Sequence, residues 1–205
     1  MGLYLGKDKI SALRTIEKTN QSMKAYLEAG GKCKDNDAVS FEGCWQDSDW
    51  ENVTDCTRMF YDCSKLTTIP AMDTSNVTNM ERMFGSCSKL TSVPEMNTSN
   101  VKSMSSMFSG CYELTSVPAF DTSNVTSMSY MFSSCGKLES IHMHGMKVSF
   151  DISVSTRFTR EALVEILNNL ATVTTSPTLT MGSTNLAKLT DADKAIATGK
   201  GWKLA

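Results

Sequence analysis

Hydroxyl, aromatic and charged side chains recur along the chain in a pattern that suits the binding of a polysaccharide. Thr67, Thr91 and Thr115 lie 24 residues apart, and a row of hydroxyls can both donate and accept hydrogen bonds. Tyrosines and charged residues interrupt this regularity, where they could supply stacking platforms and specificity. The alternative is that all these residues are ordinary solvated positions. The candidate ligand-binding residues are Tyr61, Lys65, Thr67, Lys89, Thr91, Tyr112, Glu113, Thr115, Tyr130 and Lys137.

The sequence carries no arrangement typical of an enzyme active site, such as a nucleophile elbow, a phosphate loop or a zinc-binding spacing. The two histidines, His142 and His144, would share one face of a strand and could offer two metal ligands. A third ligand is not in view, so we favour two surface residues. We therefore expect a protein that is not an enzyme and that needs no cofactor or metal.

Four of the seven cysteines, Cys63, Cys87, Cys111 and Cys135, also lie 24 residues apart. At the same position of successive repeats, their side chains should stack in parallel about 5 Å apart. Parallel Cβ vectors do not favour the torsion of a disulfide. We interpret these cysteines as small buried hydrophobic residues, with disulfides or metal ligands as the alternative.

The same 24-residue period governs the apolar positions, which must therefore build the core. A fixed period of this length with apolar residues at constant places is typical of a solenoid made of stacked repeats. The fold class that we predict is α/β, a leucine-rich-repeat-like solenoid in which each coil has a short parallel strand and a helical segment. The most regular pairs are Met59-Phe60, Met83-Phe84, Met107-Phe108 and Met131-Phe132.

One repeat, residues 73–96, illustrates the expected local structure. Residues 73–76 (Asp-Thr-Ser-Asn) should form a turn and cap a helix. Val77, Met80, either Met83 or Phe84, and Cys87 follow at the three- and four-residue spacing of a helix face. Residues 90–93 should form a short strand that ends at Pro94, because proline cannot donate to a strand ladder. The Asp or Asn at the start of each turn could instead hold a cation, and these residues are Asp49, Asp73, Asn97 and Asp121.

The regions flanking the repeats are expected to cap them, which gives three parts: 1–48, 49–141 and 142–205. Residues 1–48 should contain a hairpin (3–10) and a helix (20–31), either as a cap or as an attachment segment. The aromatic and acidic residues of 35–51 either cover the first coil or form a ligand patch. Residues 142–205 should contain degenerate repeats with a helix at 159–170, a strand at 178–181, a helix capped by Thr190 and a strand at 202–204.

Composition excludes several classes of partner. The formal net charge is −2 with 8% aromatic residues, which does not favour a nucleic-acid surface. The sequence has no run of about 18 apolar residues, so we expect no membrane insertion. The first residues lack the basic and apolar regions of a signal peptide, and we expect a protein that is made in the cytoplasm and is not exported by a signal peptide.

The repeat Asp-Thr-Ser-Asn-Val-Thr-x-Met-x-x-Met-Phe-x-x-Cys-x-x-Leu-Thr-Ser-Val-Pro resembles the BspA-type leucine-rich-repeat family over residues 49–141. The resemblance implies a right-handed solenoid with short parallel strands and a binding role. Members of that family look like bacterial surface adhesins and secreted proteins. The segments at both ends of the chain are also similar to phage and prophage proteins of gut bacteria that carry these repeats.

Our leading hypothesis is a non-enzymatic phage virion protein, a fibre, tail or head-decorating component, that binds the host surface or glycans. Its partners would be other virion proteins through the N-terminal segment and a bacterial surface protein or polysaccharide through the solenoid. The alternatives are a rigid structural or cementing subunit that contacts only virion proteins, and an adhesin on the bacterial cell surface. The sequence leaves open the ligand, the host, the position in a virion and whether the chain forms a homo-oligomer.

Overall fold

The computed structural model describes Trp50 and residues 53–205. The predicted hairpin and helix of residues 1–48, and Asp49 of the acidic row, lie outside these residues. We number the repeats by their sequence period: the first is 49–72, the second 73–96, the third 97–120 and the fourth 121–144.

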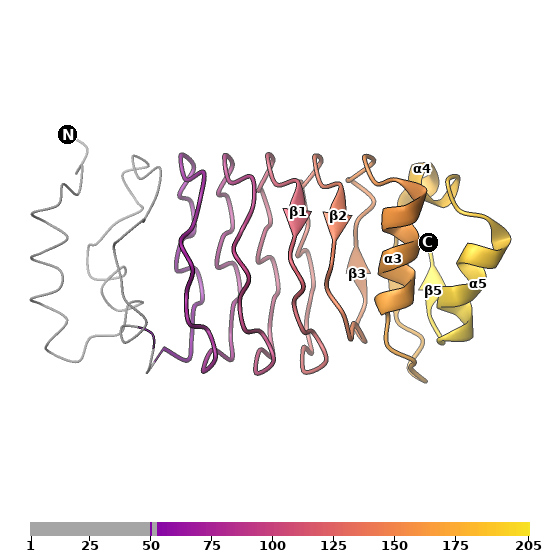
Figure 1. Ribbon diagram of the computed structural model, residues 1–205, viewed down its shortest axis with the longest axis horizontal. Coiled ribbons are helices and arrows are strands. Elements are labelled where there is room, and N and C mark those ends of the chain that lie inside the picture. The colour runs from indigo at the N-terminus through magenta and orange to yellow at the C-terminus, as the bar shows by residue number, and fades with distance from the viewer. Residues whose placement is uncertain (1–49, 51–52) are drawn as a thin grey trace, which may run out of the picture.

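Successive repeats lie side by side along the long axis of the molecule, and the C-terminal helices lie at one end of this stack (Figure 1). Single residues at the same position of each repeat form parallel bridges from Asp55 to Asn79, from Asn79 to Ser103 and from Ser103 to Ser127. Strand β1 (Ser116–Val117) pairs in parallel with β2 (Ser140–Ile141), again one repeat apart. At these positions, each repeat makes its backbone hydrogen bonds with the neighbouring repeats and not within itself.

The C-terminal region contains a second parallel sheet and three helices. The sheet has the order β3 (Phe150–Asp151), β4 (Thr178–Thr180) and β5 (Lys203–Leu204). The helices are α3 (Arg160–Asn169), α4 (Gly182–Leu186) and α5 (Asp191–Gly199). The predicted helix at 159–170, the strand at 178–181, the helix capped by Thr190 and the strand at 202–204 correspond to α3, β4, α5 and β5, whereas α4 was not predicted. Among the described residues, no helix is both long and apolar enough to cross a lipid bilayer.

The predicted helical segment of each repeat is wrong, because residues 81–86 and their equivalents form a run of turns. In the second repeat, the amides of Arg82 and Phe84 donate to Ser105 and Met107 of the next repeat. The amides between them, those of Met83 and Gly85, donate to the carbonyl three residues back. In an α-helix, the amides donate to carbonyls four residues back in the same segment. Here, alternate amides donate to the neighbouring repeat instead.

These turns require a left-handed backbone at two places in every repeat. Arg82 has a φ of 52° and Ser86 a φ of 63°, each at the third position of a turn closed by an i to i+3 hydrogen bond. A positive φ at that position is typical of type II turns. The equivalent residues in the other repeats share this conformation: Arg58, Asp62, Ser106, Gly110, Tyr130 and Ser134.

The predicted strand at 90–93 is not formed in the second repeat, where these residues lie outside any strand. The strand appears one repeat later as β1, and Pro118 follows it directly, as the missing proline amide requires. Among the described residues, a strand of two residues thus first forms between the third and fourth repeats, whereas the earlier repeats are joined by single-residue bridges.

The core runs as a continuous column through the stack. The residues predicted to point inward, Val77, Met80, Phe84 and Cys87, are all fully buried although they are not helical. Phe84 stacks on Phe60 and Phe108 with ring centroids 5.4 and 5.7 Å apart. Thr74, Thr98 and Thr122 are also buried, and each hydroxyl donates at 2.7–2.9 Å to a carbonyl 22 or 23 residues further along the chain, that of Asn97, Asp121 or His144. One column thus joins the repeats by both apolar contacts and hydrogen bonds.

Candidate ligand-binding surface

The threonine row is formed, but its hydroxyls also serve the stack itself. Thr115 Oγ1 donates to the carbonyl of Thr91 at 3.2 Å, and Thr91 Oγ1 lies 3.5 Å from the carbonyl of Thr67. These donors are therefore occupied within the protein. Only the acceptor capacity of the hydroxyl oxygens remains for a ligand.

The charged row places unlike charges next to each other. Lys137 Nζ lies 2.5 Å from Glu113 Oε2, and this bond, together with the nearby charge of Lys89, lowers the pKa of the Glu113 carboxyl. Lys65 and Lys89 occupy the same position of earlier repeats and are exposed. The row is a solvated face in which the Glu113 carboxylate is already paired.

The three tyrosines are exposed but do not share one position of the repeat. Tyr130 is the most exposed at 75%, followed by Tyr112 at 57% and Tyr61 at 43%. Tyr61 lies under the guanidinium of Arg58, which is 5.7 Å from its ring centre, and its ring also covers Gly85. Tyr130 is the only candidate residue that lines the cavity described next.

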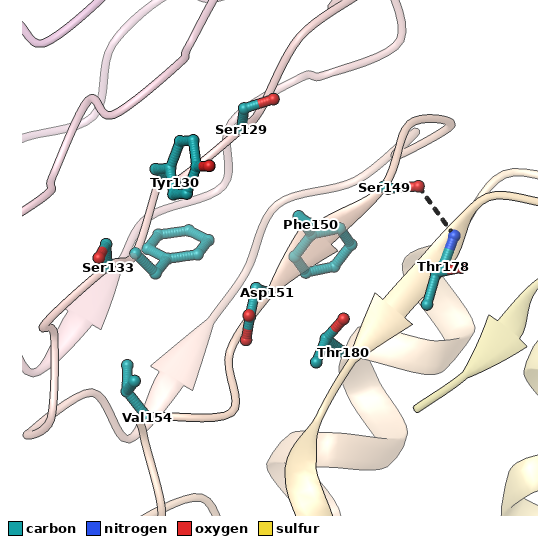
Figure 2. A pocket seen from close by; sticks show the side chains of 10 residues that line it. Ser129, Tyr130, Ser133, Ser149, Phe150, Asp151, Val154, Thr178 and Thr180 are labelled. Carbon is teal, nitrogen blue, oxygen red and sulfur yellow. Dashed lines mark hydrogen bonds between the residues drawn. The ribbon is translucent and has the colours of Figure 1, made fainter.

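A cavity of about 320 Å³ lies where the fourth repeat meets the C-terminal sheet. In Figure 2, Ser129, Tyr130 and Ser133 come from the repeat, and Thr178 and Thr180 come from β4 on the opposite side. Phe150 and Asp151 of β3 lie between these two sides. The lining is completed by Phe132, Ser149 and Val154.

The polar groups of this cavity are partly committed. The Asp151 carboxylate accepts a hydrogen bond at Oδ1 from the amide of Ser153 at 2.7 Å, and Ser149 Oγ accepts one from the amide of Thr178 at 2.9 Å. Within residues 53–205, no partner is found for Asp151 Oδ2 or for the hydroxyls of Ser129, Ser133 and Thr180. The cavity therefore offers an exposed ring and several unused hydrogen-bonding groups.

Sequence reasoning identified only Tyr130 of this cavity. Ser129 and Ser133 belong to the repeat, but nothing in their spacing distinguishes them from other serines. Ser149, Phe150, Asp151, Thr178 and Thr180 lie after the periodic region, so the repeat gives no position for them. The cavity depends on where the C-terminal sheet packs against the stack.

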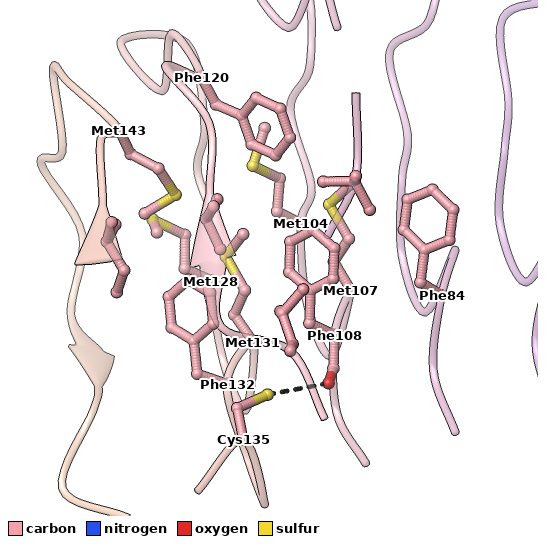
Figure 3. Packing of buried hydrophobic residues seen from close by; sticks show 14 of the residues in the cluster. Phe84, Met104, Met107, Phe108, Phe120, Met128, Met131, Phe132, Cys135 and Met143 are labelled. Atoms are coloured by element: carbon pink, nitrogen blue, oxygen red, sulfur yellow. Dashed lines mark hydrogen bonds between the residues drawn. The ribbon is translucent and has the colours of Figure 1, made fainter. Parts of the chain in front are cut away.

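The repeat cysteines are buried hydrogen-bond donors. Cys135 Sγ lies 3.1 Å from the carbonyl of Phe108 in the preceding repeat (Figure 3), and Cys87 and Cys111 make the same contact with Phe60 and Phe84. Burial raises the pKa of the Cys87 and Cys135 thiols to about 12 and also raises that of Cys111. All three thiols are therefore protonated near neutral pH and are not nucleophiles.

The interpretation of all four repeat cysteines as unpaired is wrong at Cys63. Cys63 is disulfide-bonded, with a partner that is not among the free cysteines Cys56, Cys87, Cys111 and Cys135. Parallel stacking disfavours a disulfide between two cysteines of the repeat, but it places no restriction on a bond to a cysteine elsewhere in the chain.

The two histidines do not converge on one site. His142 Nδ1 lies 2.7 Å from Glu165 of α3, whereas His144 Nδ1 lies 3.9 Å from Asp121 of the fourth repeat. Asp73, Asn97 and Asp121 accept hydrogen bonds from the amides two residues ahead, so they cap turns as expected. The structure contains no cluster of three or more metal-ligating side chains between residues 53 and 205.

Comparison with known protein families matches residues 34–145 to the family described as "Mycoplasma protein of unknown function, DUF285". The match covers more than half of the chain. The chain belongs to this family. The DUF285 match spans all four repeats and is compatible with the resemblance to BspA-type repeat proteins. Neither the curated proteins nor the solved structures contain a match to the chain.

Proposed function

We propose that the stacked repeats form a solenoid that acts as a non-enzymatic binding module of a phage virion, as part of a fibre, a tail or a decorated head. In this proposal, the solenoid recognises a glycan or protein on the bacterial surface, and residues 1–48 attach it to other virion proteins. The observation that carries the binding role is the cavity beside Tyr130, which combines an exposed ring with unused hydrogen-bonding groups.

Two further observations support binding in preference to catalysis. The buried repeat thiols serve as donors to backbone carbonyls and are protonated near neutral pH. The parallel backbone hydrogen bonds between repeats hold the turns in fixed positions, and a fixed scaffold lowers the entropy that a surface loses when it binds a ligand.

The resemblance to BspA-type repeat proteins, with which the family match is compatible, favours a second candidate. A protein of this second type would sit on the bacterial cell surface as an adhesin. The two candidates predict different locations for the native protein. Antibody labelling of intact producer cells and of purified particles distinguishes a cell-surface protein from a virion component.

The test of the binding role is saturable attachment of the fluorescently labelled full-length chain to candidate host bacteria. A variant that combines Tyr61→Ser, Tyr112→Ser and Tyr130→Ser should attach at least about tenfold more weakly, because aromatic anchors dominate many binding surfaces. Thermal unfolding of the variant is the control for folding, since all three side chains are exposed. If the intact protein attaches to none of the bacteria but assembles with virion proteins, a structural or cementing role replaces the binding role.

A further inference from the structure

We infer that the cavity between the fourth repeat and strands β3 and β4 binds one unit of a neutral saccharide, an inference that rests on the proposed function. The cavity brings together residues that are up to about 50 positions apart, from Ser129 to Thr180. It therefore forms only when the C-terminal sheet is packed against the repeats. A site of this kind differs from the periodic rows, which extend along the whole stack.

The apolar part of the cavity suits the C–H face of a sugar ring. Tyr130 offers a ring that is 75% exposed, and the buried rings of Phe132 and Phe150 lie beside it. Val154, which is 49% exposed, adds an apolar edge. Pockets for small ligands combine such apolar walls with a few polar groups that fix the orientation.

The polar part of the cavity suits the hydroxyls of the same ring. Ser129, Ser133 and Thr180 present hydroxyls that can donate or accept, and Asp151 Oδ2 can accept from a sugar hydroxyl. Ser149 accepts from the amide of Thr178, so its own hydroxyl hydrogen is left to donate. A polyol pairs with such a mixture of donors and acceptors, whereas a purely apolar ligand would leave these groups unpaired.

The charge and the size of the cavity restrict the ligand further. Asp151 is the only charged residue among the ten that line it. A carboxylate without a lining cation repels an acidic sugar, so a neutral sugar is favoured. The volume of about 320 Å³ is near the lower end of about 300–1,000 Å³ for small-molecule pockets. We therefore expect one sugar unit of a longer chain to enter.

The backbone conformation of Tyr130 allows its ring to be removed by a substitution that fits the turn. Tyr130 has a φ of 57°, a conformation that glycine adopts more readily than any other residue. Tyr130→Gly therefore removes the ring without straining the turn. Ser106→Gly is the matched control, because Ser106 has a φ of 55° at the same position of the preceding repeat and does not line the cavity.

The test is calorimetric titration of the full-length protein with maltotriose, cellotriose, chitotriose and galactotriose, and with trigalacturonic acid as the anionic probe. We expect saturable binding of at least one neutral probe. Tyr130→Gly should weaken it about tenfold or more, equivalent to about 1.4 kcal/mol, and Ser106→Gly should leave it unchanged. Asp151→Asn should weaken neutral binding and raise the affinity for trigalacturonic acid, because the repelling charge is lost while Oδ1 can still accept from Ser153.

The inference is overturned if no neutral probe binds up to about 10 mM, a range that extends beyond millimolar affinities. It is also overturned if Tyr130→Gly binds as tightly as the wild type. The third contrary outcome is that trigalacturonic acid binds the wild type as well as the neutral probes do. Attachment of the same proteins to bacteria separates this failure from that of the proposed function. Wild-type attachment without saccharide binding overturns the saccharide site alone and indicates a surface protein as the ligand.

Discussion

At the scale of single residues, the left-handed positions of the turns show how the repeat tolerates unfavourable backbone conformations. Each left-handed residue other than glycine costs roughly 1–2 kcal/mol relative to the right-handed form. Seven of the eight turn positions carry such a residue, and only Gly110 avoids the cost. The hydrogen bonds that each turn makes to the next repeat offset this strain.

Ser106→Gly should therefore stabilise the protein. Ser106 has a φ of 55°, and glycine removes the steric cost while losing more entropy on folding, so we expect a net gain of up to about 1 kcal/mol. The measurement is the urea midpoint of unfolding. Ser109→Gly is the matched control: Ser109 lies in the same turn run outside the left-handed positions, so glycine there should destabilise by about 0.5–1 kcal/mol. Equal effects at both positions would contradict the explanation.

The cysteines illustrate why residue types are easier to predict than their bonds. The sequence predicted that Cys87, Cys111 and Cys135 are buried, because they share the period of the apolar positions. It could not predict that each thiol donates to a phenylalanine carbonyl of the preceding repeat. That contact depends on the path of the turns, which the spacing alone does not specify.

At the scale of elements, local signals determined which predictions were correct. Helices α3 and α5 directly follow Thr159 and Thr190, whose side chains cap their first turns, and such caps can be recognised in a sequence. The turn runs have the same three- and four-residue spacing as a helix, because i to i+3 bonds also return the chain to one face. The sequence therefore predicted the buried face correctly and the backbone wrongly.

The start of α5 should make the protein sensitive to acid. Asp193 accepts hydrogen bonds from Arg160 and from the amide and hydroxyl of Thr190, which lower its pKa to about 2. A carboxyl with a lowered folded-state pKa stabilises the fold above its ordinary pKa of 3.8, and this contribution is lost as the pH falls through about 2. Stability should therefore decrease between about pH 4 and pH 2.

Asp193→Asn should remove most of this acid dependence and be less stable than the wild type at pH 7. Asp191→Asn is the matched control, since Asp191 lies in the first turn of the same helix with a fully exposed side chain. Urea unfolding at several pH values between 7 and 2 provides the measurement. An unchanged acid dependence in Asp193→Asn would show that the Arg160 pair does not govern it.

Lys200, the residue after α5, caps the C-terminal end of α3. Its ammonium group donates to the carbonyls of Leu167, Asn168 and Leu170 at the C-terminal end of α3, and burial lowers its pKa. Hydrogen bonds to charged groups contribute about 1.5–3 kcal/mol, so Lys200→Met should lower the free energy of unfolding by about that amount. Lys203→Met, at an exposed position of β5, should change it little in the same denaturation experiment.

At the scale of the whole molecule, the phenylalanine column links the repeats into one cooperative unit. Phe108 stacks on Phe84, Phe120 and Phe132, so its removal interrupts the column near its middle. In stacked-repeat proteins, each repeat depends on its neighbours for stability. The two sides of an interruption should then unfold separately.

Phe108→Ala should lower the free energy of unfolding by about 3–5 kcal/mol and divide the unfolding transition. Hydrogen exchange should accelerate in the first and second repeats while α3 and β4 remain protected. Tyr112→Ala, an exposed change in the same repeat, should alter neither property. A single loss of protection across the whole chain would show that the molecule stays cooperative without the column.

The 24-residue period predicts which residues of the repeats are buried, but it does not predict the cavity, which lies where the repeats end. Every buried position between Val77 and Leu138 except Gly85 follows from the 24-residue period. The Tyr130 cavity lies where the fourth repeat meets the sheet of Phe150 and Thr178. Neither β3 nor β4 repeats an earlier segment, so the sequence contains no second copy from which to infer their position.

The hydrogen bonds between the turn runs are the same at successive junctions, so the number of repeats can change in evolution without a new kind of junction. Four amides of the second repeat donate hydrogen bonds to carbonyls of the third repeat. The amides at the same positions of the third repeat donate to carbonyls of the fourth, and they belong to Met104, Ser106, Phe108 and Gly110. A duplication or loss of 24 codons therefore reproduces an existing junction, whereas a change of 23 or 25 would turn the buried face outward. Each such event would lengthen or shorten the molecule by about 5 Å without altering the site at its C-terminal end.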